Sequence, residues 1–179
     1  MVSSGDWALD IGANVGHYTL RLSELVGERG RVIAFEPVPE AFEVLTVNAA
    51  LAPYRNITLI NAAISESTSI SGMEIPKYED SELDNLYLAQ LSAAASWLQV
   101  LCITVDSLAL PHPIRFVKID TEGHELAVLR GMKGLLNRDR PILVVEDNDP
   151  KVSPYLAGFG YSSEKVAGSS NMIFHPDEG

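Results

Sequence analysis

The chain has little of three things: cysteine, positive charge and long apolar runs. Cys102 is the only cysteine in 179 residues, which excludes an internal disulfide and a thiolate-rich metal site and fits a reducing compartment. A formal net charge of −11 argues against a general nucleic-acid or anionic-membrane surface. No uncharged apolar run approaches the roughly 20 residues of a membrane span, and no signal peptide is visible. We therefore expect a cytoplasmic protein forming one domain, residues 1–179.

Apolar runs alternate with helical patterns along most of the chain, which predicts an α/β fold with a mostly parallel sheet. The expected strands of this sheet are 7–11, 31–35, 57–60, 116–119 and 142–145. The expected helices are 17–26, 39–51 and 122–136. Residues 66–96 indicate a β excursion, and 97–105 form a further apolar, β-prone run. The last 22 residues predict an antiparallel strand pair at one edge of the sheet.

A glycine-containing turn, DIGANVG, follows the first expected strand. Gly12 and Gly16 allow a bound group to approach the backbone, and the N-terminus of the next helix favours an anionic group. A purely structural turn explains the same residues equally well. The turn alone therefore leaves two interpretations open.

Glu36 ends the second expected strand and comes 24 residues after Gly12. This spacing is close to that of acids which accept hydrogen bonds from ribose hydroxyls, so a nucleoside ligand is favoured over a solvated carboxylate. The turn lacks the G-x-G-x-x-G of dinucleotide sites, and Asp10 would repel a pyrophosphate. S-adenosylmethionine has a ribose and an ammonium group but no phosphate. It is the favoured cofactor.

Four ionisable side chains crowd the six residues DTEGHE after the strand at 116–119: Asp120, Glu122, His124 and Glu125. Such crowding is typical of sites where pKa values are tuned, so we consider Asp120, Glu122 and His124 as catalytic candidates. His124 is also compatible with a solvated turn. Glu125 suits a structural role beside the positive end of the following helix.

A second acidic stretch, residues 146–149, follows the strand at 142–145. With Asp120 and His124 it could make an oxygen-rich site for a divalent cation. Acidic turns are common without a metal, and the sequence favours no metal site.

Several segments, in this order, resemble the FkbM family of S-adenosylmethionine-dependent methyltransferases: DIGANVGHYTL, VIAFEPVPEAFEVLTVNAAL, INAAIS, ITVDSL, FVKIDTEGHELAVLRGM and PILVVE. The resemblance covers residues 5–146 and implies a Rossmann-like class I methyltransferase fold. It also implies O-methylation of a hydroxyl on a sugar, glycolipid or natural product. This sequence has few residues before the first strand, where family members usually have more.

The resemblance implies roles for individual residues. The residues expected to hold the methionine part and to begin the adjoining helix are Asp10, Gly12, Ala13, Asn14, Gly16, His17, Tyr18 and Thr19. Glu36 would hold the ribose, with Pro37 beneath the adenine. Ala63 and Ile64 fall where an acid commonly contacts the adenine amino group, so that contact would come from the backbone, Asn61 or Ser65. Asp120 matches the acid near the sulfonium and the acceptor.

The expected partners are a small-molecule or glycan-type acceptor and, as a possibility, a second copy of the chain. A nicotinamide-dependent oxidoreductase and a non-catalytic nucleoside-binding module remain as alternatives. Nucleic-acid methylation is disfavoured, because Asp120-Thr121-Glu122-Gly123 replaces the Asn/Asp-Pro-Pro-Tyr tetrad typical of such enzymes. Within the excursion, Tyr78, Asp84, Asn85 and Tyr87 are the expected acceptor wall.

Overall fold

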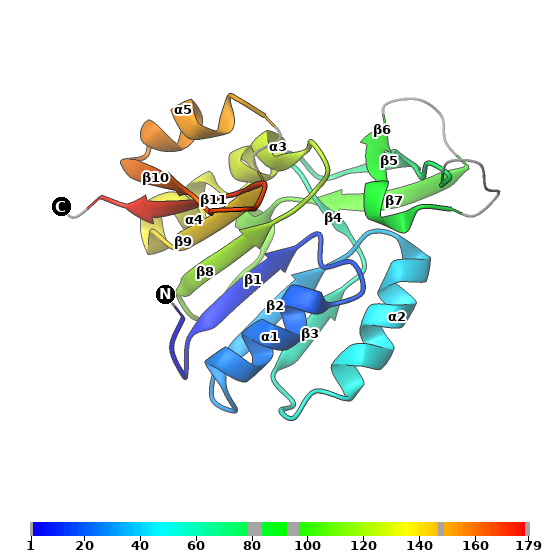
Figure 1. Ribbon diagram of the computed structural model, residues 1–179, viewed down its shortest axis with the longest axis horizontal. Helices are drawn as coiled ribbons and strands as arrows, with labels where there is room; N and C mark the ends of the chain where they lie inside the picture. The colour runs from blue at the N-terminus through cyan, green and yellow to red at the C-terminus, as the bar shows by residue number, and fades with distance from the viewer. Residues whose placement is uncertain (1, 79–83, 93–96, 147–148, 178–179) are drawn as a thin grey trace.

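A parallel sheet with an antiparallel hairpin at one end forms the centre of the molecule (Figure 1). The computed structural model describes residues 2–78, 84–92, 97–146 and 149–177. In these residues the main sheet has the order β10-β11-β9-β8-β1-β2-β3. Its strands are β1 (Trp7–Ile11), β2 (Arg31–Phe35), β3 (Ile57–Ile60), β8 (Ile114–Ile119), β9 (Ile142–Glu146), β10 (Tyr161–Lys165) and β11 (Asn171–Pro176). The strands β1, β2, β3, β8 and β9 are parallel, and β11 pairs antiparallel with β9 and β10.

Helices cover both faces of this sheet because the side chains of each strand alternate between the faces. Ala8 of β1 packs with Leu22 and Val26, whereas its neighbour Leu9 packs into the large core that includes Val128. The helices of the first face are α1 (His17–Val26) and α2 (Pro39–Ala50). Those of the second face are α3 (Glu125–Arg130), α4 (Lys133–Asp139) and α5 (Val152–Ala157). Within the described residues, no helix has the length and apolar character needed to cross a membrane.

A smaller, four-stranded sheet lies beyond the carboxyl ends of β1 and β2 (Figure 1). Its order is β4-β7-β5-β6, with strands β4 (Ala63–Ile64), β5 (Ser69–Glu74), β6 (Gln90–Ser92) and β7 (Leu98–Ile103). Of two 3₁₀ turns, η1 (Leu86–Leu88) lies between β5 and β6 in the chain, and η2 (Val105–Ser107) follows β7. Met73 and Val100 of this sheet pack with Val38 and Ala41, so a separate apolar cluster joins the small sheet to the start of α2.

The structure confirms the α/β fold with its mostly parallel sheet, the β excursion and the antiparallel tail, and it corrects one helix. The helix expected at 122–136 is wrong: two short helices occupy this region, and the first begins only at Glu125. Glu122 has a φ of 50°, a left-handed conformation that cannot belong to an α-helix. The β-prone run at 97–105 forms β7, which pairs in the small sheet. Helix α5 has no counterpart among the expected elements.

Gly131, which lies between α3 and α4, is closely packed against another segment of the chain. A Cβ atom there would lie 1.9 Å from the carbonyl oxygen of Ser65, so the backbone after β4 sits where a side chain would be. We expect Gly131→Ala to lower the free energy of unfolding by about 2 kcal/mol, because backbone must move to admit one methyl group. Urea denaturation measures this loss.

Gly158→Ala is the matched control. Gly158 has an ordinary φ of −64°, and a Cβ atom added there would lie 3.2 Å from its nearest neighbour, the backbone oxygen of Tyr155. A Gly131→Ala protein as stable as the Gly158→Ala protein would contradict the packing argument.

Candidate active site

One pocket of about 190 Å³ lies at the carboxyl ends of β1, β2 and β8, between the two sheets. In the sheet, β1 has β2 on one side and β8 on the other, so the strand order reverses direction at β1. Open α/β sheets bind ligands at such a switch point. Most residues expected from the sequence to form the site line this pocket: Gly12, Ala13, Asn14, His17, Tyr18, Glu36, Pro37, Ala63, Ile64, Asp120, Glu122 and His124.

Asp10, Gly16 and Thr19 lie behind the pocket lining. Thr19 donates a hydrogen bond from its hydroxyl to the buried carboxylate of Asp10, which ties the end of β1 to the first turn of α1. Burial raises the pKa of Asp10 to about 6, against the hydrogen bond from Thr19 and the charge of Lys118. Gly16 precedes α1 with a φ of 101°. These three residues therefore shape the turn from behind.

Gly12 brings the turn after β1 onto the end of β8. A Cβ atom at Gly12 would lie 1.8 Å from the carbonyl oxygen of Asp120, and its φ of +81° also favours glycine. No side chain caps the N-terminus of α1, whose first turn begins at His17. The backbone N–H groups there are suited to a carboxylate ligand.

Glu36 is 95% buried at the end of β2, and both of its carboxylate oxygens face backbone donors. Its Oε2 accepts a hydrogen bond from the backbone N–H of Asn14 at 2.7 Å, and its Oε1 accepts one from Val38 at 2.8 Å. Burial raises the pKa of Glu36 to about 7, although these two hydrogen bonds act in the opposite direction. A buried carboxylate of this kind gains from further donors such as the hydroxyls of a ribose.

The residues expected to replace the missing adenine acceptor are already engaged. Asn61 donates from its side-chain amide to the backbone oxygens of Glu36 and Pro37, at 2.8 and 3.1 Å. The Ser65 hydroxyl lies 2.9 Å from Nε2 of His124. Ala63 and the adjoining Ala62 form a buried apolar wall of the pocket, which is suited to the flat face of an aromatic base.

Asp120 is held by the buried cation Lys118. The Nζ atom of Lys118 donates to Oδ2 of Asp120 at 2.9 Å, and the Lys118 side chain is fully buried. The Asp120 side chain is 32% exposed and lines the pocket. Removing Lys118 would leave this carboxylate without its ion pair, which makes Lys118 part of the site. A lysine within the apolar run FVKI was the signal in the sequence, and the sequence prediction missed it.

The loop after β8 is shaped from beneath by Glu125. Its Oε1 atom accepts hydrogen bonds from the backbone N–H groups of Thr121 and Gly123 and from the Thr121 hydroxyl, at 3.0 to 3.1 Å. These bonds hold the left-handed backbone of Glu122, an uncommon conformation for a residue with a side chain. Glu125 is buried and organises the loop. This structural role is larger than the expected interaction with the positive end of the helix.

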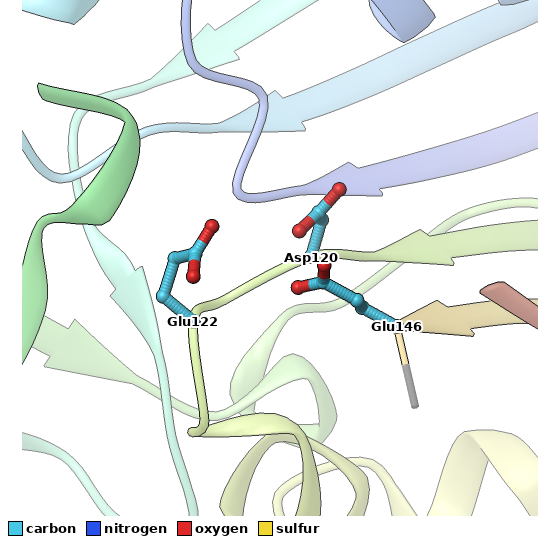
Figure 2. Close-up of side chains that lie close together, drawn as sticks. All are labelled: Asp120, Glu122 and Glu146. Atoms are coloured by element: carbon cyan, nitrogen blue, oxygen red, sulfur yellow. The ribbon is translucent and has the colours of Figure 1, made fainter. Parts of the chain in front are cut away.

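Three carboxylates gather on one side of the pocket (Figure 2): Asp120 after β8, Glu122 in the following loop and Glu146 at the end of β9. One oxygen of each lies within 4.8 Å of those of the other two, close enough to share a divalent cation. Burial, then the charges of Glu146 and Asp120, raise the pKa of Glu122 to about 7. His124 is not part of this group, and residues 147–148 of the expected acidic stretch lie outside the described residues.

His124 faces the pocket from the residue before α3. Burial lowers its pKa, although the charges of Glu125 and Glu66 oppose the change, so the imidazole is favoured in its neutral form. One ring nitrogen lies beside the Ser65 hydroxyl, as described above. A neutral histidine can accept a proton through its other nitrogen.

The small sheet and its loops supply the far wall of the pocket, through Met73, Leu86, Tyr87, Ala89 and Leu91. Among the four residues expected from the sequence to form this wall, Tyr87 is in the lining. Tyr78 is exposed. Asp84 forms an isolated antiparallel β-bridge with Lys77 through the backbone, and Asn85 caps η1. The wall is therefore more apolar than expected.

The residues of the pocket fit three separate parts of S-adenosylmethionine. Glu36 can accept from ribose hydroxyls, the apolar wall at Ala62 and Ala63 suits an adenine, and the first turn of α1 suits the methionine carboxylate. The carboxylates near Asp120 suit a positively charged sulfonium. No lysine or arginine occurs among the described residues that line the pocket, so the lining offers no permanent cation for a pyrophosphate.

Comparison with known proteins gives a consistent result. A family model described as a methyltransferase FkbM domain matches residues 10–161. The chain is 32% identical over 139 residues to hexuronic acid methyltransferase AglP of Haloferax volcanii, covering 75% of this chain and 53% of that protein. It therefore spans about half the length of this curated relative.

Solved structures share the fold. The methyltransferase FkbM of Methylobacillus flagellatus superposes with a TM-score of 0.70 at 16% identity, covering 98% of this chain and 44% of that one. Fibrillarin of Aeropyrum pernix, solved with natively bound S-adenosyl-L-methionine, gives a TM-score of 0.60 at 16% identity, covering 96% and 66%.

Proposed function

We propose that this chain, which belongs to the FkbM methyltransferase family, transfers the methyl group of S-adenosylmethionine to a hydroxyl of a sugar-type acceptor. The observation that carries the proposal is the convergence of Glu36 and Asp120 on one pocket. These two acids end strands β2 and β8, on either side of β1. Family membership favours this function over a nicotinamide-dependent oxidoreductase. The hexuronic acid methyltransferase among the relatives supports a sugar acceptor.

In this proposal Glu36 binds the ribose, and the first turn of α1 binds the methionine carboxylate. Bound S-adenosylmethionine supplies an electrophilic methyl group. Asp120 accepts the proton of the acceptor hydroxyl, and its ion pair with Lys118 fixes where its oxygens lie. Glu122 and His124 are the alternative proton acceptors. Much of the rate enhancement comes from positioning the acceptor in line with the methyl group.

A direct assay tests the function. Purified protein is incubated with S-adenosylmethionine and a panel containing neutral monosaccharides, hexuronic acids and glycolipids, while S-adenosylhomocysteine formation and acceptor mass are followed. We expect product with at least one sugar and none without an acceptor. Methylation confined to amines or thiols would contradict O-methylation. Calorimetry that shows binding of NAD and not of S-adenosylhomocysteine would restore the oxidoreductase.

Cofactor binding is expected to release a proton near pH 6. The pKa of Glu36 is raised to about 7, so below this pH its carboxyl is largely protonated in the free protein. Ribose hydroxyls that donate to Glu36 stabilise its ionised form, so binding lowers the pKa and tightens as the pH rises from 5.5 to 8. Calorimetry of S-adenosylhomocysteine binding in buffers of different ionisation enthalpy measures the released proton.

Glu122→Gln is the control for this prediction, because Glu122 lines the same pocket and its pKa is also raised to about 7. The Glu122→Gln protein should still release the proton. If the release disappeared in that variant, Glu122 and not Glu36 would be its source.

A further inference from the structure

The C-terminal hairpin, β10–β11 with its connecting turn, contacts the site from outside the segment matched by the family model. That segment ends at residue 161, the first residue of β10. Asn171 begins β11 and pairs with Glu146 at the end of β9, which places the turn beside the acidic side of the pocket. The hairpin therefore lies next to Asp120 and Glu146 without lining the pocket itself.

All three hydrogens of the Lys118 ammonium group have acceptors within reach. Besides Asp120, Nζ donates to Oδ1 of Asn171 at 2.9 Å and to the backbone oxygen of Ile119 at 3.2 Å. The Asn171 oxygen is the only one of these acceptors that comes from outside β8 and its end. Since Lys118 is fully buried, its position depends on these acceptors.

The orientation of the Asn171 amide is fixed by Ser169. The side-chain Nδ2 of Asn171 donates to the Ser169 hydroxyl at 2.8 Å, and its backbone N–H donates to the same oxygen at 3.1 Å. With Nδ2 held there, Oδ1 faces Lys118. The neighbouring Ser170 donates to Oε1 of Glu146 at 3.1 Å. Three consecutive residues of one turn thus reach two carboxylates of the site, one directly and one through Lys118.

We infer that Asn171 is a positioning residue of the active site: it holds the Lys118 ammonium group, which in turn holds the Asp120 carboxylate in the pocket. The chain of contacts runs from Ser169 to Asn171, Lys118 and Asp120, each link a hydrogen bond of 2.8 to 2.9 Å. The role assigned to Asp120 rests on the proposed methyl transfer. The position of its carboxylate does not.

Asn171→Ala removes the hairpin acceptor of the Lys118 ammonium group without substituting Lys118 itself. We expect kcat for methyl transfer to fall about tenfold, because small displacements of a positioned group are costly. The dissociation constant of S-adenosylhomocysteine should stay within about twofold of the wild-type value. The residues proposed to bind the ribose and the adenine take no part in the hydrogen bonds that link Asn171 to Asp120. Asn171→Asp keeps an acceptor for Lys118 and should recover kcat to within about threefold of wild type.

Asn137→Ala is the matched control, an identical change at an exposed position of α4, and should leave kcat unchanged. Equal losses for Asn171→Ala and Asn171→Asp, or an unchanged kcat in Asn171→Ala, would overturn the inference. The inference would also be overturned if Asn171→Ala lowered the melting temperature, the cofactor affinity and kcat together. That result would indicate a merely structural role for Asn171.

Crystal structures of the wild-type and Asn171→Ala proteins test the inference without relying on turnover. We expect the Asp120 carboxylate to leave its Lys118-paired position in the variant. An unchanged Lys118–Asp120 pair would overturn the positioning role. If the wild-type protein transferred no methyl group to any acceptor, the proposed function would fail, while these two structures would still decide the inference.

Discussion

Replacing Glu36 with alanine is expected to weaken S-adenosylhomocysteine binding about 100-fold. The variant loses a buried carboxylate that would accept from the ribose, and hydrogen bonds to charged groups contribute about 1.5–3 kcal/mol each. A loss of about 3 kcal/mol corresponds to about two powers of ten in affinity. The backbone N–H groups of Asn14 and Val38 also lose their acceptor, so the turn that would hold the methionine part loosens. Isothermal titration calorimetry measures the change.

The control is Glu40→Ala, the same substitution on the exposed side of α2. It should bind S-adenosylhomocysteine as the wild type does. Thermal unfolding of both variants separates lost binding from lost folding. An affinity of the Glu36→Ala protein within about threefold of wild type would contradict the assignment of the ribose to Glu36.

Replacing Asp120 with asparagine is expected to lower kcat by about 100-fold or more while leaving cofactor affinity within about threefold. General acid–base catalysis by a positioned side chain typically contributes about 10²–10⁴-fold, and an amide cannot accept the proton. Asparagine keeps an oxygen for the hydrogen bond from Lys118, so the shape of the site is preserved. Steady-state kinetics with a sugar acceptor, together with calorimetry, separate the two quantities.

Glu28→Gln, in the exposed connection between α1 and β2, controls for the loss of one negative charge. Glu122→Gln and His124→Ala, assayed in parallel, rank the alternative proton acceptors. Should Asp120→Asn retain more than about half of the wild-type kcat while His124→Ala loses it, His124 would become the base.

Local signals in the sequence predicted the main sheet and the position of Glu36 well. A short apolar run that ends on a glycine or an acid predicts both the strand and where its functional residue lies, as at Gly12 and Glu36. The antiparallel tail was also predicted, since two β-prone runs flank the small turn residues at 168–171. These features depend on residues close together in the chain.

The remaining features depend on contacts between distant segments. Gly131 packs against the backbone of Ser65, more than 60 residues earlier, and no helical pattern could reveal this contact. Lys118 meets Asn171 only because β11 is inserted beside β9. The left-handed backbone at Glu122 depends on the Glu125 side chain beneath it, so the expected helix start was three residues early.

The two sheets divide the pocket between them. The residues proposed for the cofactor and the chemistry come mostly from the ends of the parallel strands, whereas the apolar wall at Met73, Tyr87 and Leu91 belongs to the small sheet and its loops. A separate apolar cluster joins that sheet to Val38 and Ala41. If the acceptor of the proposed reaction contacts this wall, variation in the loops changes which acceptor fits while the carboxylates at the strand ends keep their places. Such a construction lets one transfer reaction diversify over many acceptors, and it marks the small sheet as the part to exchange when a new acceptor is wanted.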